Sequence, residues 1–261
     1  MPPHPPVRPA LRALARRGLI AAAVAALVPA APGTAAPLEL TRLVDSPTAG
    51  LLEKAQYGLD VRLFADGGVA TQLSAGALRR LTIGVAYGGR GILGNRSVDW
   101  FDRLEAGVRC RLVEESAAWP AVAVGYETQG FGAPDHGHYN SRSKGVFVSA
   151  SRNYTSWFGQ FGVHAGANLA AGTEDGDGDI SGWLGVDKTV VGTIAALAEY
   201  DLGRSADGRD GSGLGSPLVH AGLRIGVTPQ LTVAVYLKDL LTQTDADQIT
   251  RELSVCYVER F

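Results

Sequence analysis

The chain has 261 residues and is 46% hydrophobic but only 7% aromatic, and it contains 34 glycines. Glycine destabilises a helix interior by roughly 1 kcal/mol relative to alanine, whereas strands tolerate it where they bend or approach other backbone, so this composition favours β-structure. The formal net charge is −2 at pH 7. A chain without a basic excess has no electrostatic footprint for nucleic acid, which we therefore exclude as a partner.

Residues 1–36 have the order of a secretion signal. A positive region without acids comes first and contains Arg8, Arg12, Arg16 and Arg17. An apolar stretch over 18–28 follows, and then the small-residue sequence "PAAPGTAA". A membrane-spanning helix needs about 20 apolar residues, so this stretch is too short for a comfortable anchor. We expect residues 1–36 to be a signal peptide that is cleaved after Ala35 or Ala36.

The rest of the chain alternates apolar and polar residues, which is the period of a β-strand with two different faces. In "DRLEAGVRCRLVEE" at 102–115, Val108 and Leu112 fall on one face and Arg109 and Arg111 on the other. Segments of this kind predict twelve strands, at 56–65, 68–76, 81–88, 101–113, 119–130, 144–154, 158–170, 179–188, 192–203, 216–227, 230–238 and 249–261.

The connections between these segments alternate in length. Even-numbered connections are short, such as "ALRR", "TSW" and "TPQ". Odd-numbered ones are mostly long, such as "GFGAPDHGHYNSR", with the first, "DGG", as the exception. Short periplasmic turns and long outer loops are typical of outer-membrane barrels. We therefore predict an all-β fold, a single transmembrane antiparallel β-barrel of about 12 strands over 56–261, located in the outer membrane with periplasmic termini.

Residues 37–55 precede the first strand. Ser46 could cap a short helix in which Pro47 takes the first position. The sequence is consistent with a periplasmic lead-in segment and with a partial plug of the barrel.

The two faces of the predicted strands differ in charge. One face is small and apolar, as expected towards lipid, and the other is polar, as expected in a wet or plugged lumen. The candidate lumen-lining residues are Glu105, Arg109, Arg111, Glu127, His164, Glu199, Asp201, Arg224 and Lys238. They would form either a charged path or docking surface for a polar glycan, or a network of ion pairs that fills a narrow barrel. Cys110 falls on a lipid face and Cys256 on a lumen face of strands that do not pair, so we expect no disulfide.

The final segment, "RELSVCYVERF" at 251–261, is predicted to close the barrel by pairing with the first strand. Its lipid-facing residues resemble the carboxy-terminal signal that the barrel-assembly machinery reads, and they are Leu253, Val255, Tyr257 and Phe261. Glu259 departs from that signal, because it stands where an aromatic residue is usual.

Three patterns that could carry chemistry are weak. "TEDGDGDI" at 173–180 has the alternating aspartates of a calcium loop but not its glycine or its glutamate, so we favour an acidic outer loop, with calcium binding as the alternative. "DHGHYNS" at 135–141 offers two histidines without a third zinc ligand. Neither His164 nor His220 stands in a pattern that supplies a nucleophile and a base. We expect no cofactor, no metal site and no enzymatic activity.

Several segments resemble the YjbH-type outer-membrane family, among them "LTIGVAYGGRGILG" (81–94), "CRLVEESAAWPAVAVGYETQGFG" (110–132) and the terminal "RELSVCYVERF". The resemblance runs from 45 to 261 and implies a single-barrel form of a family linked to exopolysaccharide production and export. It implies a non-enzymatic role in exopolysaccharide or capsule assembly or export. The partners it implies are polysaccharide and export-system proteins. Outer-membrane lipid is expected from the apolar strand faces, and the barrel-assembly machinery from the carboxy-terminal signal. A small passive channel or structural porin-like protein is the alternative, and a barrel enzyme acting on lipid or glycan is the third.

Overall fold

The computed structural model describes residues 39–128, 134–135, 138–139, 145–157, 159–170, 180–202, 217–242 and 249–261. The predicted signal peptide, nearly all of the acidic loop at 173–180 and most of the two-histidine loop at 135–141 lie outside these residues. Within them, no helix is both long and apolar enough to cross a membrane.

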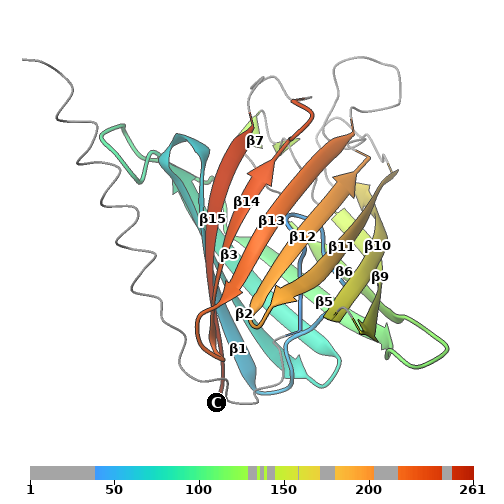
Figure 1. Cartoon of the computed structure of the whole chain (residues 1–261). Coiled ribbons are helices and arrows are strands. Elements are labelled where there is room, and N and C mark those ends of the chain that lie inside the picture. The colour runs from blue at the N-terminus through green and yellow to red at the C-terminus, as the bar shows by residue number, and fades with distance from the viewer. Residues whose placement is uncertain are drawn as a thin grey trace, which may run out of the picture. The chain divides into compact units, whose positions relative to one another are not determined.

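The described residues form a barrel of twelve antiparallel strands (Figure 1). The strands are β1 Gln56–Phe64, β2 Gly68–Leu78, β3 Leu81–Arg90, β5 Glu105–Val113, β6 Ala121–Glu127, β9 Gly145–Ser156, β10 Gly159–Ala170, β11 Ile180–Val191, β12 Ile194–Asp201, β13 Leu218–Gly226, β14 Leu231–Lys238 and β15 Thr250–Arg260. Three short strands and one turn lie between them, namely β4 Asp99–Trp100, β7 Pro134–Asp135, β8 His138–Tyr139 and the 3₁₀ turn η1 Ala65–Gly67.

Closure of the sheet comes from the pairing of β1 with β15, which runs from Gln56 opposite Arg260 to Leu63 opposite Leu253. Every other barrel strand pairs with its neighbours in chain order. A closed barrel leaves no row of unpaired backbone groups facing lipid. The predicted twelve-stranded antiparallel barrel is thereby confirmed.

Strand boundaries differ from the predicted ones by a few residues. The fourth barrel strand, β5, begins at Glu105 and not at 101, because residues 99–100 form β4 and pair with the end of β3. Short turns join β2 to β3, β9 to β10, β11 to β12 and β13 to β14 at one end of the barrel, where β1 begins and β15 ends (bottom of Figure 1). We call this the short-turn end.

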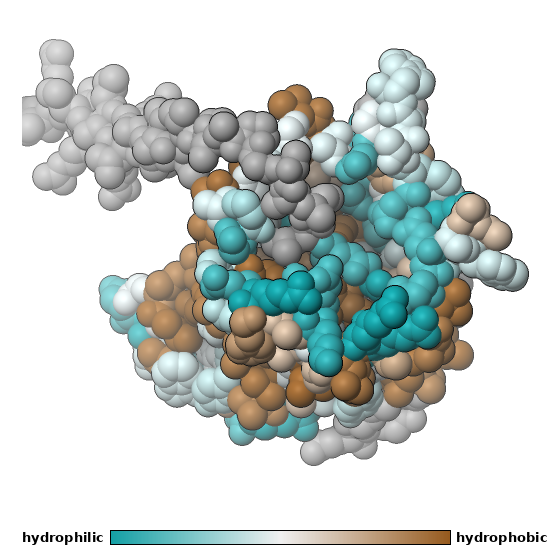
Figure 2. All heavy atoms as spheres, turned by 90° about the horizontal axis from the view of Figure 1, so that it is seen from below, coloured by the Kyte–Doolittle hydropathy of each residue, from teal (hydrophilic) through white to brown (hydrophobic). Residues whose placement is uncertain are grey.

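Side chains alternate between an apolar outer surface and a polar lumen. On β14, Val235 and Leu237 are exposed, whereas Tyr236 and Lys238 are buried. Seen from below in Figure 2, hydrophilic residues gather in the middle of the molecule and hydrophobic residues surround them. An apolar outer surface around charged side chains is the reverse of a soluble barrel and is the pattern of an outer-membrane barrel.

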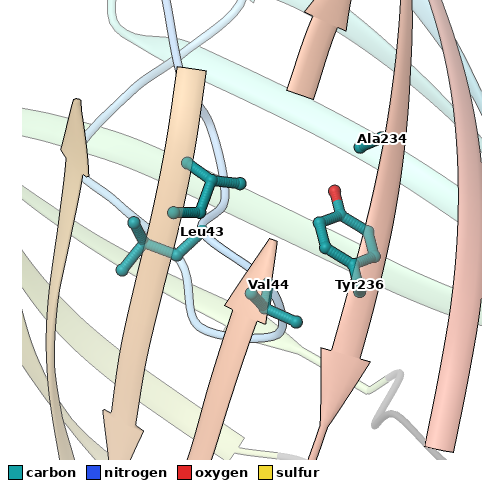
Figure 3. Packing of buried hydrophobic residues seen from close by; sticks show 5 residues of the cluster. Leu43, Val44, Ala234 and Tyr236 are labelled. Carbon is teal, nitrogen blue, oxygen red and sulfur yellow. The ribbon is translucent and has the colours of Figure 1, made fainter. Parts of the chain in front are cut away.

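A small apolar core lies inside the barrel, where residues preceding β1 meet the wall. Leu43 and Val44 pack against Leu197 of β12 and against Ala234 and Tyr236 of β14 (Figure 3). Leu43 and Val44 are completely buried. The segment before the first strand is therefore part of the barrel interior.

Candidate functional site

Residues 39–52, hereafter the plug, lie inside the lumen before the chain joins β1 (blue trace in Figure 1). Arg42 and Pro47 form an isolated bridge, and the N–H of Leu43 donates to the carbonyl of Ser46 over 2.9 Å. The tip is thus a tight turn of extended chain, and the predicted helix capped by Ser46 is absent from it. The Ser46 hydroxyl instead donates to Glu199 of the wall. The segment predicted as a lead-in or partial plug occupies the lumen.

Glu199 of β12 anchors the tip of the plug. Its Oε2 accepts the backbone N–H groups of Val44, Asp45 and Ser46 over 2.9, 3.0 and 3.0 Å. Its Oε1 accepts the Ser46 hydroxyl over 3.0 Å. Only 2% of Glu199 is exposed. Hydrogen bonds to an ionised acceptor are the strong ones, and converging backbone N–H groups make a natural anion site, so Glu199 fixes the turn.

A four-membered ion-pair network lies beside this anchor. Asp45 of the plug contacts Arg62 over 2.6 Å and Lys238 over 2.7 Å, and both cations also contact Glu252. Burial alone would raise the pKa of the Asp45 carboxyl, but the charges of Lys238 and Arg62 outweigh burial and hold that pKa well below its ordinary range. Two cations and two anions balance, which lets these charges stay ionised away from water.

Arg109 of β5 holds the other side of the plug. Its guanidinium donates to the carbonyls of Thr41 and Gly50, and it pairs with Glu127 of β6 over 2.7 Å. Glu127 also pairs with Arg42 of the plug over 3.1 Å. Arg109 therefore joins two separate parts of the plug to the wall through one planar group with several donors.

Further contacts fix the base and flank of the plug. Arg111 donates to the Ala49 carbonyl and pairs with Glu39. The Leu52 N–H donates to the Thr82 hydroxyl over 3.1 Å. These bonds use backbone groups of the plug that would otherwise be buried without partners, which would be costly.

Two serines of β9 complete the contacts with the plug. The Ser149 hydroxyl donates to the Thr48 carbonyl over 3.0 Å. The Ser151 hydroxyl accepts the Ala49 N–H over 2.8 Å and lies 2.8 Å from Nδ1 of His164.

The predicted lumen residues all face inward, and the structure divides them into two groups. Five contact the plug, namely Arg109, Arg111, Glu127, Glu199 and Lys238. The other four lie elsewhere on the wall. Glu105 pairs with Arg103, and His164 contacts Ser151. Asp201 accepts the Ser181 hydroxyl, and Arg224 is half-buried on β13. The inward charges thus hold a chain segment as well as one another.

Sequence reasoning missed several residues of this site. Arg62 and Glu252 lie on the polar faces of predicted strands, and the alternation that selected the other charges would have selected them too. The pattern gave no such signal for Asp45, Ser149 and Ser151. Each of them contacts a residue that lies more than a third of the chain length away in sequence, and the two serines carry no charge.

The carboxy-terminal residues form an aromatic cluster at the short-turn end. The Phe261 ring lies 5.0 Å from the Tyr57 ring, and Phe261 is 84% exposed. The hydroxyls of Tyr57 and Tyr257 both donate to Glu259, the former over 3.2 Å. Aromatic side chains of this kind suit a membrane interface.

Metal-ligating side chains do not gather in the described part of the chain, where no three His, Cys, Asp or Glu side chains converge. Cys110 of β5 and Cys256 of β15 are both free thiols.

Several solved structures are similar to this chain, but no protein family is identified for it. No family model matches the chain, and no curated protein matches it. Among solved structures, the NanC porin is 13% identical with a TM-score of 0.46, and the match covers 78% of this chain and 99% of the porin. Omp33, an outer-membrane protein of Acinetobacter baumannii, is 11% identical with a TM-score of 0.45 over 80% of this chain and 99% of that one. The calcium-bound dimer of the outer-membrane phospholipase of Salmonella typhi is 11% identical with a TM-score of 0.36, and the match covers 80% and 91%.

Proposed function

We propose that this protein is an outer-membrane barrel that is closed by its own plug and acts as a partner in exopolysaccharide or capsule assembly or export. The observation that supports a closed barrel is the burial of residues 43–50 inside the lumen. The apolar outer surface supports the membrane location. Both ends of the barrel chain lie at the short-turn end, which we assign to the periplasm.

The chemistry of the lumen wall supports a glycan-related role. Glu199 accepts hydrogen bonds from the plug, and Arg109 and Arg111 donate to it. A sugar chain carries hydroxyl groups that donate and accept, so it could meet the same wall groups once the plug has moved. The resemblance of the strands to a family linked to exopolysaccharide export points in the same direction. Export-system proteins and the barrel-assembly machinery are the partners of this proposal.

A porin-like passive channel is the second candidate, and the charged lumen favours it, since rings of charged side chains suit ion passage. Such a channel would conduct only after the plug leaves the lumen, because residues 43–50 occupy its interior. A passive channel would therefore have the plug outside the lumen at rest, whereas the proposed closed barrel has it inside. The two candidates differ in this resting position of the plug in the wild-type barrel.

Conductance in planar bilayers, together with surface polysaccharide in cells, tests the proposal. The wild-type barrel is expected to be silent, and a variant without residues 39–50 is expected to conduct. A steady open pore in the wild type would favour the passive channel. A silent barrel whose deletion leaves surface polysaccharide unchanged in amount and length would contradict the export role.

A further inference from the structure

A second cluster in the lumen has the connectivity of an activated serine. The Ser151 hydroxyl lies 2.8 Å from Nδ1 of His164, and Nε2 of His164 lies 2.7 Å from Oδ1 of Asp187. Ser151 on β9 and His164 on β10 are directly opposite each other, and Asp187 on β11 is opposite Gly162, two residues from His164. A nucleophile, a base and an orienting carboxylate within hydrogen-bond reach are the signature of a covalent catalytic site.

For a neutral His164, the hydrogen-bond partners assign a direction to each bond. An ionised carboxylate can only accept, so Nε2 of His164 carries the proton that is donated to Asp187. Nδ1 of a neutral imidazole then has a free lone pair. Ser151 already accepts the Ala49 N–H, which leaves its own proton to be donated to Nδ1 of His164. This is the arrangement in which a histidine can take the serine proton.

Gly162 provides the space in which Asp187 reaches His164. A Cβ at this position would lie 2.2 Å from Oδ1 of Asp187 and 2.7 Å from Nε2 of His164. Any side chain here would displace the carboxylate from the imidazole. The pairing of Asp187 with His164 thus depends on the absence of a side chain at position 162 of β10.

Ser149 shows what a serine with a purely structural role looks like in the same strand. It lies two residues from Ser151, is also buried, and bonds to the Thr48 carbonyl of the plug. Contact with the plug therefore requires only a hydroxyl. His164 and Asp187 are additions that this contact does not need.

We propose that Ser151, His164 and Asp187 form a site of acyl transfer that takes small carboxylic esters, such as O-acetyl groups on polar molecules, and that the plug keeps it silent. Ser151 is 5% exposed and His164 is 3% exposed, and Ala49 of the plug covers the hydroxyl. The Asp187 side chain is more open, at 21%. A lumen lined by charged and polar side chains suits a small acyl group on a hydrophilic carrier better than a lipid.

The reaction proceeds in two balanced halves with water as the second substrate. Ser151 Oγ attacks the ester carbonyl carbon while its proton passes to Nδ1 of His164. The alcohol leaves with that proton, and the acyl group stays on Ser151. Water then attacks the acyl carbon, gives a proton to His164, and the carboxylic acid leaves as Ser151 regains its proton. Asp187 positions His164 and stabilises the imidazolium throughout.

The test is covalent labelling of the purified folded barrel with a fluorophosphonate probe, followed by mass mapping of the labelled residue. Wild type is expected to label slowly. Glu199→Gln, which loosens the plug, and a variant without residues 39–50 are expected to label faster, at Ser151. In these backgrounds His164→Ala is expected to slow labelling by about a hundredfold, the contribution of a general base. In the variant without residues 39–50, Ser149→Ala is the matched control and is expected to label at the parent rate, because Ser149 then has no Thr48 carbonyl to hold.

The positioning role of Asp187 is tested by Asp187→Asn and Gly162→Ala, which both should slow labelling, and by Asp187→Glu, which should restore part of it. The proposal is overturned if neither plug variant labels at Ser151 while migrating as a folded barrel, or if labelling survives His164→Ala. These results do not depend on the export role, since conductance and surface polysaccharide are measured separately.

Discussion

Replacement of Glu199 by glutamine tests how the plug is held. The substitution keeps the shape of the side chain and one carbonyl oxygen but removes the charge. Three backbone donors, at 44, 45 and 46, converge on a single carboxylate oxygen over 2.9–3.0 Å, so the charge serves three bonds at once. The amide nitrogen of the new side chain would face the Ser46 hydroxyl, which can accept from it.

The expected size of the effect follows from these bonds. A hydrogen bond to a charged partner contributes about 1.5–3 kcal/mol, against about 0.5–1.5 kcal/mol for a neutral pair. Glu199→Gln should therefore weaken docking of the plug by about 1 kcal/mol per bond, or about 3 kcal/mol for three bonds. Since every 1.4 kcal/mol is a factor of ten, the undocked fraction should rise by about a hundredfold.

Hydrogen exchange at the amides of 44–46 measures the undocked fraction directly, because these amides donate to Glu199 in the docked state. Their exchange should accelerate by about a hundredfold in Glu199→Gln, while amides of β10 stay unchanged. Asp60→Asn is the control, because Asp60 is a lumenal carboxylate that accepts from Ser254 of the wall. Exchange within threefold of wild type in Glu199→Gln would refute the anchoring role of this carboxylate.

Three further outcomes are expected. Ala55 joins the plug to β1 at a φ of 67°, so Ala55→Gly should stabilise the barrel by about 1 kcal/mol, seen as a higher temperature for loss of heat-modifiable gel migration. The lowered pKa of Asp45 means that its ion pairs stabilise docking above the unfolded value of about 3.9 and are lost as the pH falls towards the folded value. The protection of amides 44–46, measured as exchange relative to the intrinsic rate at each pH, should thus fall below about pH 4, and less so in Asp45→Asn. Deletion of Phe261 should slow insertion into lipid vesicles, whereas Glu259→Tyr should leave it unchanged or faster.

The barrel itself could be predicted from the sequence because its determinants are local. A two-residue period places each side chain on one of two faces, and the lengths of the connections sort the turns from the loops. Neither signal needs knowledge of distant contacts. The boundary of β5 was misplaced at 101 because residues 99–100 pair briefly with β3 before the strand begins, which is a tertiary event.

The sequence could not decide between a lead-in segment and a partial plug, because the contacts that hold the plug are not local. Ser46 and Pro47 are residues that commonly begin a helix. Helix propensity does not predict the contact of Ser46 with Glu199, which lies 153 residues further along the chain. The conformation of the plug depends on the barrel wall, because the carboxylate of Glu199 accepts the N–H groups of the tight turn. The relation of Ser151 to Asp187 was hidden for a similar reason, because it depends on the register of three strands.

Withdrawal of the plug would remove hydrogen-bond and ion-pair partners from the wall groups that bind it. Glu199 would lose four hydrogen bonds, and Arg62 and Lys238 would lose the carboxylate of Asp45. Buried charges that lose partners are costly, so the open state must supply new donors to Glu199 and new acceptors to Arg62 and Lys238 beside Glu252. Water can do both, and so can a hydroxylated chain, whereas an apolar molecule can do neither. The wall that makes the plug stable therefore also restricts what can replace it, and for the function proposed above this restriction favours a hydrated glycan over a lipid.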